Sequence, residues 1–143
     1  MTAKLLIPVD DSEIAQRAID FAAQHQSTDN PPEVVLINVR RDPEFHGEIS
    51  AQGYELLERV KRDHQERVLA KSLAYAERSG LKNVAVAAAQ GSPGDEIVRA
   101  AKQRGVDHIL MGTHGRGSMG GLLLGSVAHR VLHLAPMPVT LVK

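Results

Sequence analysis

Short apolar runs alternate with amphipathic stretches along the whole chain of 143 residues. Short apolar runs bounded by polar residues are typical of strands that are buried on both faces of a parallel sheet. Five such runs predict strands at residues 5–9, 34–39, 84–89, 108–111 and 139–142. The third run is rich in alanine, which favours helices, but the flanking residues Gly80 and Gly91 favour a strand.

The stretches between these runs have apolar residues three and four positions apart, which predicts amphipathic helices. The predicted helices span residues 12–25, about 52–79, 93–104 and 127–134. Five apolar residues of the second helix fit one broad face: Leu57, Val60, Leu69, Leu73 and Ala76. The charge-rich stretch 55–67 of the same helix is interpreted as a solvated face. Ser126 is predicted to be the N-cap of the last helix.

Five strands that alternate with four helices predict an α/β fold over residues 1–143 as a single domain. The expected architecture is a five-stranded parallel sheet with helices on both faces. In such open sheets, ligands bind outside the carboxyl ends of the strands, where the strand order reverses. Asp10, Val39 and the segment 112–115 each end or follow a strand, so we expect them to meet at one rim.

A glycine-rich segment links the fourth predicted strand to the last helix. It reads Gly112-Thr113-His114-Gly115, then nine residues, then Gly125-Ser126. A strand, a glycine-rich loop and a helix start together can bind phosphate, because backbone N–H groups are accessible and the helix dipole is positive there. No Gly-Lys-Ser/Thr sequence occurs, so the segment is not a Walker A motif. The alternative interpretation is a flexible connector with spare glycines.

The predicted rim offers two kinds of phosphate ligand. Gly115, Gly125 and Ser126 supply backbone N–H groups, and Arg116 is the nearest cationic side chain unless it points to solvent. Asp10 is suited to a ribose hydroxyl, with capping of the first helix as the alternative role.

An adenine base needs an apolar slot with backbone groups at its edge. Val39 and Met111 are placed to frame such a slot, although either residue would serve equally well as plain core.

The spacing Gly112-x2-Gly115-x9-Gly125-Ser126 resembles the nucleotide-binding signature of the universal stress protein family, in its ATP-binding branch. The residues around the signature and the closing segment 135–139 are also similar to the sequences of that family. The resemblance covers nearly the whole chain and is weakest between residues 40 and 84. It implies a Rossmann-like fold of the adenine nucleotide alpha hydrolase type.

The resemblance also implies roles for individual residues. Asp10, after Pro8 and Val9, is expected to contact the ribose, and the backbone of Val39 to meet the adenine. The set expected to bind the nucleotide is Pro8, Val9, Asp10, Val39, Met111, Gly112, Gly115, Arg116, Gly125, Ser126 and Val127. Asp11 departs from the family pattern, in which many members carry a small or apolar residue. A second carboxylate there would weaken triphosphate binding or help to hold a divalent cation such as Mg²⁺.

Composition excludes several functions. Lys plus Arg and Asp plus Glu each number 17, and this balance argues against a general nucleic-acid or anionic-membrane surface. Scarce aromatic residues argue against base stacking on single strands. The chain has no cysteine and therefore no disulfide or thiol chemistry. Its first apolar run is too short for a signal peptide or membrane span, so a cytoplasmic protein is expected.

The other candidate residues lack supporting partners in the sequence. His129 and His133 are spaced to share a zinc ion, but no third ligand is evident and no metal site is predicted. His114 lies in the glycine-rich loop and is interpreted as exposed, with phosphate contact or proton donation as the alternative. Ser126 has no evident His–Asp relay that would make it a nucleophile. No catalytic residue is therefore predicted.

We predict an ATP-binding sensor or regulator of the stress response, with ADP or AMP as alternative ligands. No base is placed to activate water, so at most slow hydrolysis is expected. The resemblance also implies a homodimer through Val139–Val142, an apolar edge strand with unpaired backbone groups. A protein client is a further expected partner. The alternative functions are a nucleotide-hydrolysing enzyme, using His114 or a metal held by Asp10 and Asp11, and a ligand-free regulatory module for a transporter or kinase.

Overall fold

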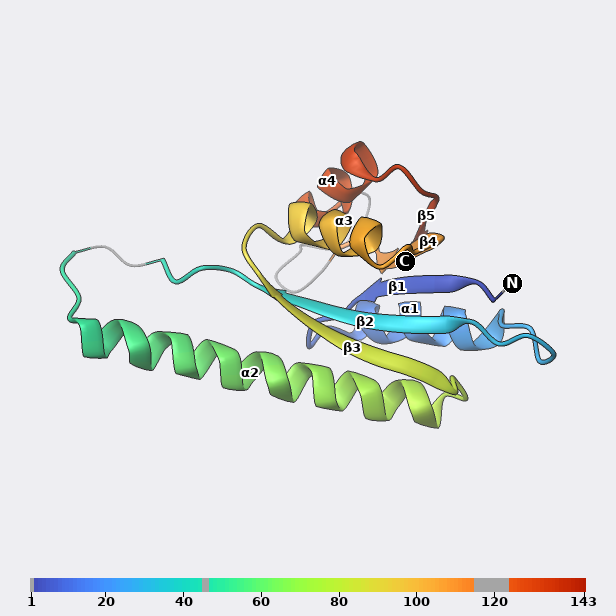
Figure 1. The fold of residues 1–143 in the computed structure, drawn as a ribbon, viewed down its shortest axis with the longest axis horizontal. Helices are drawn as coiled ribbons and strands as arrows, with labels where there is room; N and C mark the ends of the chain where they lie inside the picture. The colour runs from blue at the N-terminus through green and yellow to red at the C-terminus, as the bar shows by residue number, and fades with distance from the viewer. Residues whose placement is uncertain (1, 45–46, 115–123) are drawn as a thin grey trace.

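The computed structural model describes residues 2–44, 47–114 and 124–143, and these form alternating strands and helices. Figure 1 shows the arrangement. The elements are β1 (Lys4–Pro8), α1 (Glu13–Gln24), β2 (Glu33–Arg40), α2 (Ala51–Arg78), β3 (Asn83–Gln90), α3 (Pro93–Gln103), β4 (His108–Gly112), α4 (Ser126–Leu134) and β5 (Val139–Val142). The predicted order of elements is confirmed, and the main differences are ends that shift by one or two residues.

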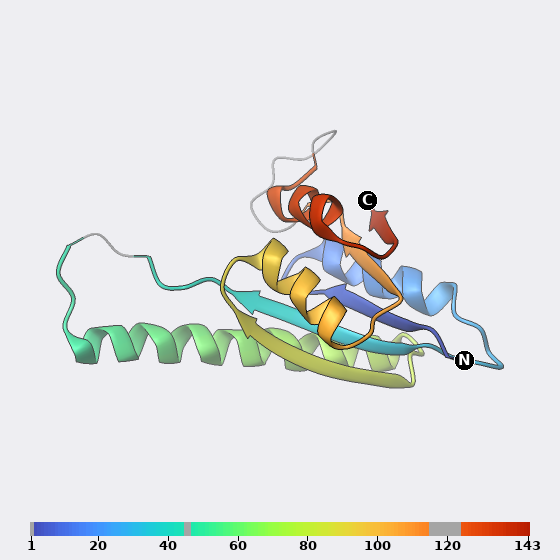
Figure 2. The same ribbon diagram turned by 45° about the horizontal axis from the view of Figure 1, so that its top comes forward.

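All strand pairs of the sheet are parallel, and the strands lie in the order β3-β2-β1-β4-β5. From β1 the chain first builds outward to β2 and β3. It then crosses back to place β4 on the other side of β1, so the strand order reverses between β1 and β4. β5 forms one edge of the sheet, beside β4 (Figure 2). The predicted α/β class with helices on both faces is confirmed.

Two apolar layers hold the helices on the sheet. Ile7, Leu36 and Leu110 point to the side of α1 and α2, and the next or preceding residue of each strand points to the side of α3 and α4. This alternation follows from the two-residue repeat of a strand. Most of the large side chains that are fully buried come from β1, β2 and β4, so the centre of the sheet is also the centre of the core.

The amino-terminal half of α2 extends past the carboxyl end of the sheet (Figure 1). A helix of 28 residues is about 42 Å long, whereas a strand of eight residues is about 26 Å long. Leu57 and Val60 are therefore 37 % and 55 % exposed, so the sheet does not cover this end of the apolar face of α2. The residues that α2 buries are Gln65, Val68, Leu69, Ser72 and Ala76.

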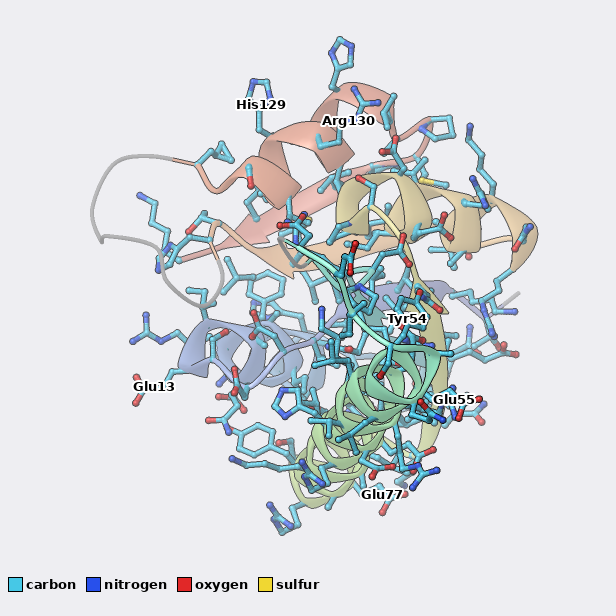
Figure 3. All side chains as sticks on the ribbon, turned by 90° about the vertical axis from the view of Figure 1, so that its left-hand side faces the viewer. Glu13, Tyr54, Glu55, Glu77, His129 and Arg130 are labelled. Carbon is cyan, nitrogen blue, oxygen red and sulfur yellow. The ribbon has the colours of Figure 1, made fainter. Side chains whose placement is uncertain are left out.

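The start of helix α3 packs closely against α4. A Cβ atom on Gly94 would lie 2.7 Å from Cβ of Arg130, so a residue without a side chain is required at this contact. Arg130 of α4, labelled in Figure 3, forms an ion pair with Asp95 of α3 at 3.0 Å. A hydrogen bond from Ser92 and the contact with Arg130 lower the pKa of Asp95. These contacts hold the amino-terminal ends of both helices at the same edge of the sheet.

No helix in the described part of the chain combines the length and the apolar character that crossing a membrane requires.

Candidate functional site

A cavity of about 450 Å³ opens at the carboxyl edge of the sheet, where the strand order reverses between β1 and β4. Its walls come from the ends of β1, β2 and β4 and from the starts of α1, α3 and α4. Every predicted site residue that the structure describes lines it: Pro8, Val9, Asp10, Val39, Met111, Gly112, Gly125, Ser126 and Val127. The two other predicted residues, Gly115 and Arg116, lie outside the described residues.

Asp10 lies directly after β1 and is held by the residue that caps α1. The backbone N–H of Ser12 donates a hydrogen bond of 2.9 Å to Oδ1 of Asp10, and the Ser12 hydroxyl donates to the same oxygen. Ser12, rather than Asp10, is the N-cap of α1, because its Oγ accepts the N–H of Ala15 at 3.4 Å. The capping alternative for Asp10 is therefore wrong, and its carboxylate lies at the cavity wall in a fixed orientation.

Helix α4 begins at Ser126 with backbone donors next to the cavity. Gly125 is its N-cap, with an extended backbone and a carbonyl that accepts the N–H of His129 at 3.0 Å. The prediction that Ser126 caps this helix was wrong, and no side chain in the described residues caps it. The N–H groups of Ser126, Val127 and Ala128 precede that first helical bond, and all three residues line the cavity. Such a helix start attracts an anion through its donors and its dipole.

The two glycines at the ends of the loop are required by close packing. Neither has a positive φ. A Cβ on Gly112 would lie 2.7 Å from Cγ1 of Ile14, and one on Gly125 would lie 3.1 Å from Cα of His114. The N–H of Gly125 donates to the carbonyl of Thr113 at 2.7 Å, which joins the two ends of the loop. The Gly125 N–H is therefore used to close the loop. The N–H groups that a ligand in the cavity could reach are those of Ser126, Val127 and Ala128.

One wall of the cavity is apolar. Val39 and Met111 line it together with Ile37, Ile97 and Ala128, and all five belong to the apolar layer beneath α3 and α4. Met111 is 5 % exposed, so both interpretations made from the sequence hold for it: it is core and it faces the cavity. An apolar wall together with a few polar groups is typical of sites that bind a small molecule in one orientation.

Several lining residues were not predicted. Asn38 lines the cavity, and its Nδ2 donates to the carbonyl of Val9 at 2.7 Å. Arg41 brings a cationic side chain to the cavity lining. Pro93 and Ile97 bring α3 to the lining as well. The signal for Asn38 was present, since it is a polar residue inside an apolar run. The contribution of α3 could be predicted only with knowledge of the strand order, which brings the start of that helix beside α4.

The residues that were considered as metal ligands or proton donors do not all lie at the main cavity. Asp11 does not line the main cavity but lines a neighbouring hollow of about 160 Å³ between α1 and α2, which shares Asp10 and Ala15 with that cavity. His114 does line the cavity, and its Nδ1 lies 3.0 Å from the hydroxyl of Thr113. His129 stands on the outer side of α4 (Figure 3). Within residues 2–44, 47–114 and 124–143, no three side chains of the metal-binding types gather closely enough to hold an ion.

The fold and the cavity define an open parallel α/β protein with an anion-attracting helix start at its switch point. The model of the universal stress protein family matches residues 1–143. The chain belongs to the universal stress protein family, so the resemblance to that family is confirmed at the level of the family.

Two relatives and one solved structure illustrate the match. Universal stress protein MJ0531 from Methanocaldococcus jannaschii is 33 % identical, with 98 % of this chain and 81 % of the relative covered. A universal stress protein from Thermus aquaticus is 32 % identical, with both chains fully covered. The solved structure of protein MJ0577, also from Methanocaldococcus jannaschii, is 32 % identical, has a TM-score of 0.81, and covers 100 % of this chain and 96 % of that one.

Some more distant members of the fold were solved with nucleotides. The Archaeoglobus fulgidus universal stress protein was solved with dAMP, at 20 % identity and a TM-score of 0.69, covering 100 % of this chain and 98 % of that one. An Arabidopsis thaliana family member was solved with AMP, at 18 % identity and a TM-score of 0.68, covering 99 % and 91 %. At these identities the likeness establishes the shared fold.

Proposed function

We propose that this chain binds an adenine nucleotide, with ATP as the principal ligand, in the cavity between β1 and β4. Through this binding it acts as a sensor or regulator of the stress response in the cytoplasm. The observation that carries the proposal is the meeting of three complementary surfaces in one cavity. These are the carboxylate of Asp10, the free donors at the start of α4, and the apolar wall around Val39 and Met111.

Each surface fits one part of the nucleotide. The N–H groups of Ser126 and Val127 would donate to phosphate oxygens, with the α4 dipole favouring the negative charge. The carboxylate of Asp10 would accept a ribose hydroxyl. The adenine would lie on the apolar wall, where the β2 backbone at Val39 offers groups to its edge. A Mg²⁺ ion bound with ATP would neutralise part of the phosphate charge. Structures of distant members with AMP and dAMP support adenine as the base.

The cavity is built for binding more than for hydrolysis. Rapid hydrolysis needs a base positioned to orient water at the terminal phosphate. His114 is the candidate among the described lining residues, but its Nδ1 pairs with the hydroxyl of its neighbour Thr113 rather than with a carboxylate that would make the ring a stronger base. We therefore propose a regulator with at most slow turnover of ATP.

Asp10→Asn is expected to weaken binding of ATP by about 10- to 100-fold, because a hydrogen bond to a charged group contributes about 1.5–3 kcal/mol. The asparagine keeps an oxygen that accepts from Ser12, so the start of α1 should remain intact. Isothermal titration calorimetry of the wild-type protein and the variant with ATP, ADP and AMP measures this change.

Asp11→Asn is the matched control, since it removes the same charge from the neighbouring residue, which does not line the cavity. Equal losses in both variants would show that net charge, and not a ribose contact, causes the effect. Absence of wild-type binding would favour the ligand-free regulatory module. Fast turnover that disappears in His114→Ala would favour the hydrolase.

We also propose that two copies pair through β5. All four residues of β5 remain partly exposed, and the strand lies at the sheet edge with one side of its backbone unpaired in the sheet order. Such an edge is completed when it pairs with another strand. Sedimentation equilibrium should give twice the 15.5 kDa chain mass, and a monomer across the micromolar range would refute the pairing.

A further inference from the structure

A buried glutamine of α2 joins the ends of two strands beneath the cavity. Gln65 is 3 % exposed, although it lies in the charge-rich stretch that was interpreted as a solvated face. Its Nε2 donates to the backbone carbonyls of Asn38 at 2.8 Å and of Ala89 at 2.9 Å. Carbonyl oxygens only accept hydrogen bonds, so these two contacts fix which way the amide of Gln65 faces. The carboxyl ends of β2 and β3 are thereby tied to α2.

The same amide also holds the side chain of Asn38. Nε2 of Gln65 lies 3.2 Å from Oδ1 of Asn38, while Nδ2 of Asn38 donates to the carbonyl of Val9 at 2.7 Å. The N–H of Val9 in turn donates to the carbonyl of Ile37 at 2.8 Å. Both polar groups of the Val9 backbone are therefore fixed by β2, one of them through the Asn38 side chain.

Val9 is the residue directly before Asp10, so this chain of contacts reaches the cavity. Gln65 does not line the cavity, whereas Asn38, Val9 and Asp10 all do. Without the donor of Gln65, Oδ1 of Asn38 would lose the donor that holds it. The carbonyls of Asn38 and Ala89, which lie in the paired part of β2 and β3, would each lose a hydrogen bond from α2. Burying unpaired acceptors is unfavourable, so the Asn38 side chain would turn away and release the Val9 carbonyl.

We propose that Gln65 is a positioning residue for the nucleotide site: through Asn38 and the Val9 carbonyl it fixes the Asp10 carboxylate in its binding orientation. This inference rests on the proposed function. The proposal gives Gln65 a role in binding although it lies in α2, a helix that contributes no residue to the cavity lining.

Gln65→Glu tests the role because it replaces the donor by a group whose donor depends on pH. The ionised carboxylate would face the oxygens of Asn38 and Ala89 and could donate to neither. The protonated acid keeps one O–H donor and the same shape. Burial among the oxygens of Asn38 and Ala89 should raise the pKa of the introduced carboxyl above its ordinary value of about 4.3. We therefore expect ATP affinity of the variant to be about tenfold below wild type at pH 8 and to approach wild type as the pH is lowered to about 5.5. The ratio of the two affinities at each pH removes the effect of pH on ATP itself.

Ser72→Ala is the matched control, since Ser72 is the other buried polar side chain of α2 in the described chain and takes no part in the hydrogen bonds that hold Asn38. Its affinity ratio to wild type should stay near one at both pH values. Gln65→Met, with no donor and a similar length, should lose affinity equally at both pH values. It serves as the second variant if Gln65→Glu does not fold.

The outcomes separate the two proposals. Tight wild-type binding with a pH-independent ratio near one for the Gln65 variants would overturn the positioning role alone. Failure of the wild-type protein to bind ATP would overturn the proposed function and this inference with it. NMR of the Asn38 side-chain amide adds a direct reading, because its resonances should shift in Gln65→Met and remain unchanged in Ser72→Ala.

Discussion

Replacing Gly125 with valine is expected to weaken ATP binding about 100-fold while the domain stays folded. The new Cβ would lie 3.1 Å from Cα of His114 and 3.3 Å from the carbonyl oxygen of Thr113. Both contacts are with backbone, so the two ends of the loop must separate. The donors of Ser126 and Val127 would then move relative to Asp10. Loss of two hydrogen bonds to phosphate, at about 1.5 kcal/mol each, corresponds to about 100-fold in affinity.

The fold should survive because Gly125 has a φ of −63°, which valine adopts readily. Calorimetric titration with ATP and thermal unfolding of the same sample give the two readings. Leu124→Val is the matched control, since it places the same side chain one residue earlier, at a position that is 40 % exposed and does not line the cavity. Unchanged affinity in Gly125→Val would remove the start of α4 from the binding site.

Ile109→Ala is expected to lower the free energy of unfolding by about 2–5 kcal/mol. Ile109 is 0 % exposed in β4 and packs in the apolar layer under α3 and α4. Truncation removes apolar contact and leaves a cavity that the surrounding strands can fill only in part. Since a domain of this size is stabilised by only about 5–15 kcal/mol, the change should be large in urea denaturation.

Val86→Ala is the matched control for this core substitution. Val86 also lies in a strand but is 42 % exposed on β3, so its truncation should change stability by less than about 0.5 kcal/mol. Equal losses in the two variants would contradict the assignment of β4 to the centre of the core.

The fold was predictable because its signal is local. Each buried strand is a short apolar run, and each helix repeats its apolar residues at the helical period, so the element order follows from the sequence alone. The overhang of α2 was not predictable in this way. Leu57 and Val60 fit an apolar face, but whether that face meets the sheet depends on the length of β2 and β3 relative to the helix. The start of α4 also depended on tertiary contacts, because the Thr113 carbonyl places Gly125, and not Ser126, at the cap.

The cavity residues that end strands were predictable, since parallel strands bring their carboxyl ends to one rim. Asp10 and Val39 follow from that rule together with the glycine signature. Asn38 and Gln65 do not, because a polar residue in an apolar run and an uncharged residue among charges show no partner in sequence. Only the folded chain reveals that Gln65 donates to Asn38 and that the Asn38 amide in turn donates to the carbonyl of Val9.

Chemical-shift mapping of the wild-type protein with ATP tests the central claim most directly. In ¹H–¹⁵N spectra, we expect saturable shifts of the backbone amides of Asp10, Val39, Ser126 and Val127 at one nucleotide per chain. Absence of saturation at millimolar ATP would contradict the account. So would shifts that gather instead at the apolar hollow on the opposite edge of the sheet, around Phe21 and Leu110.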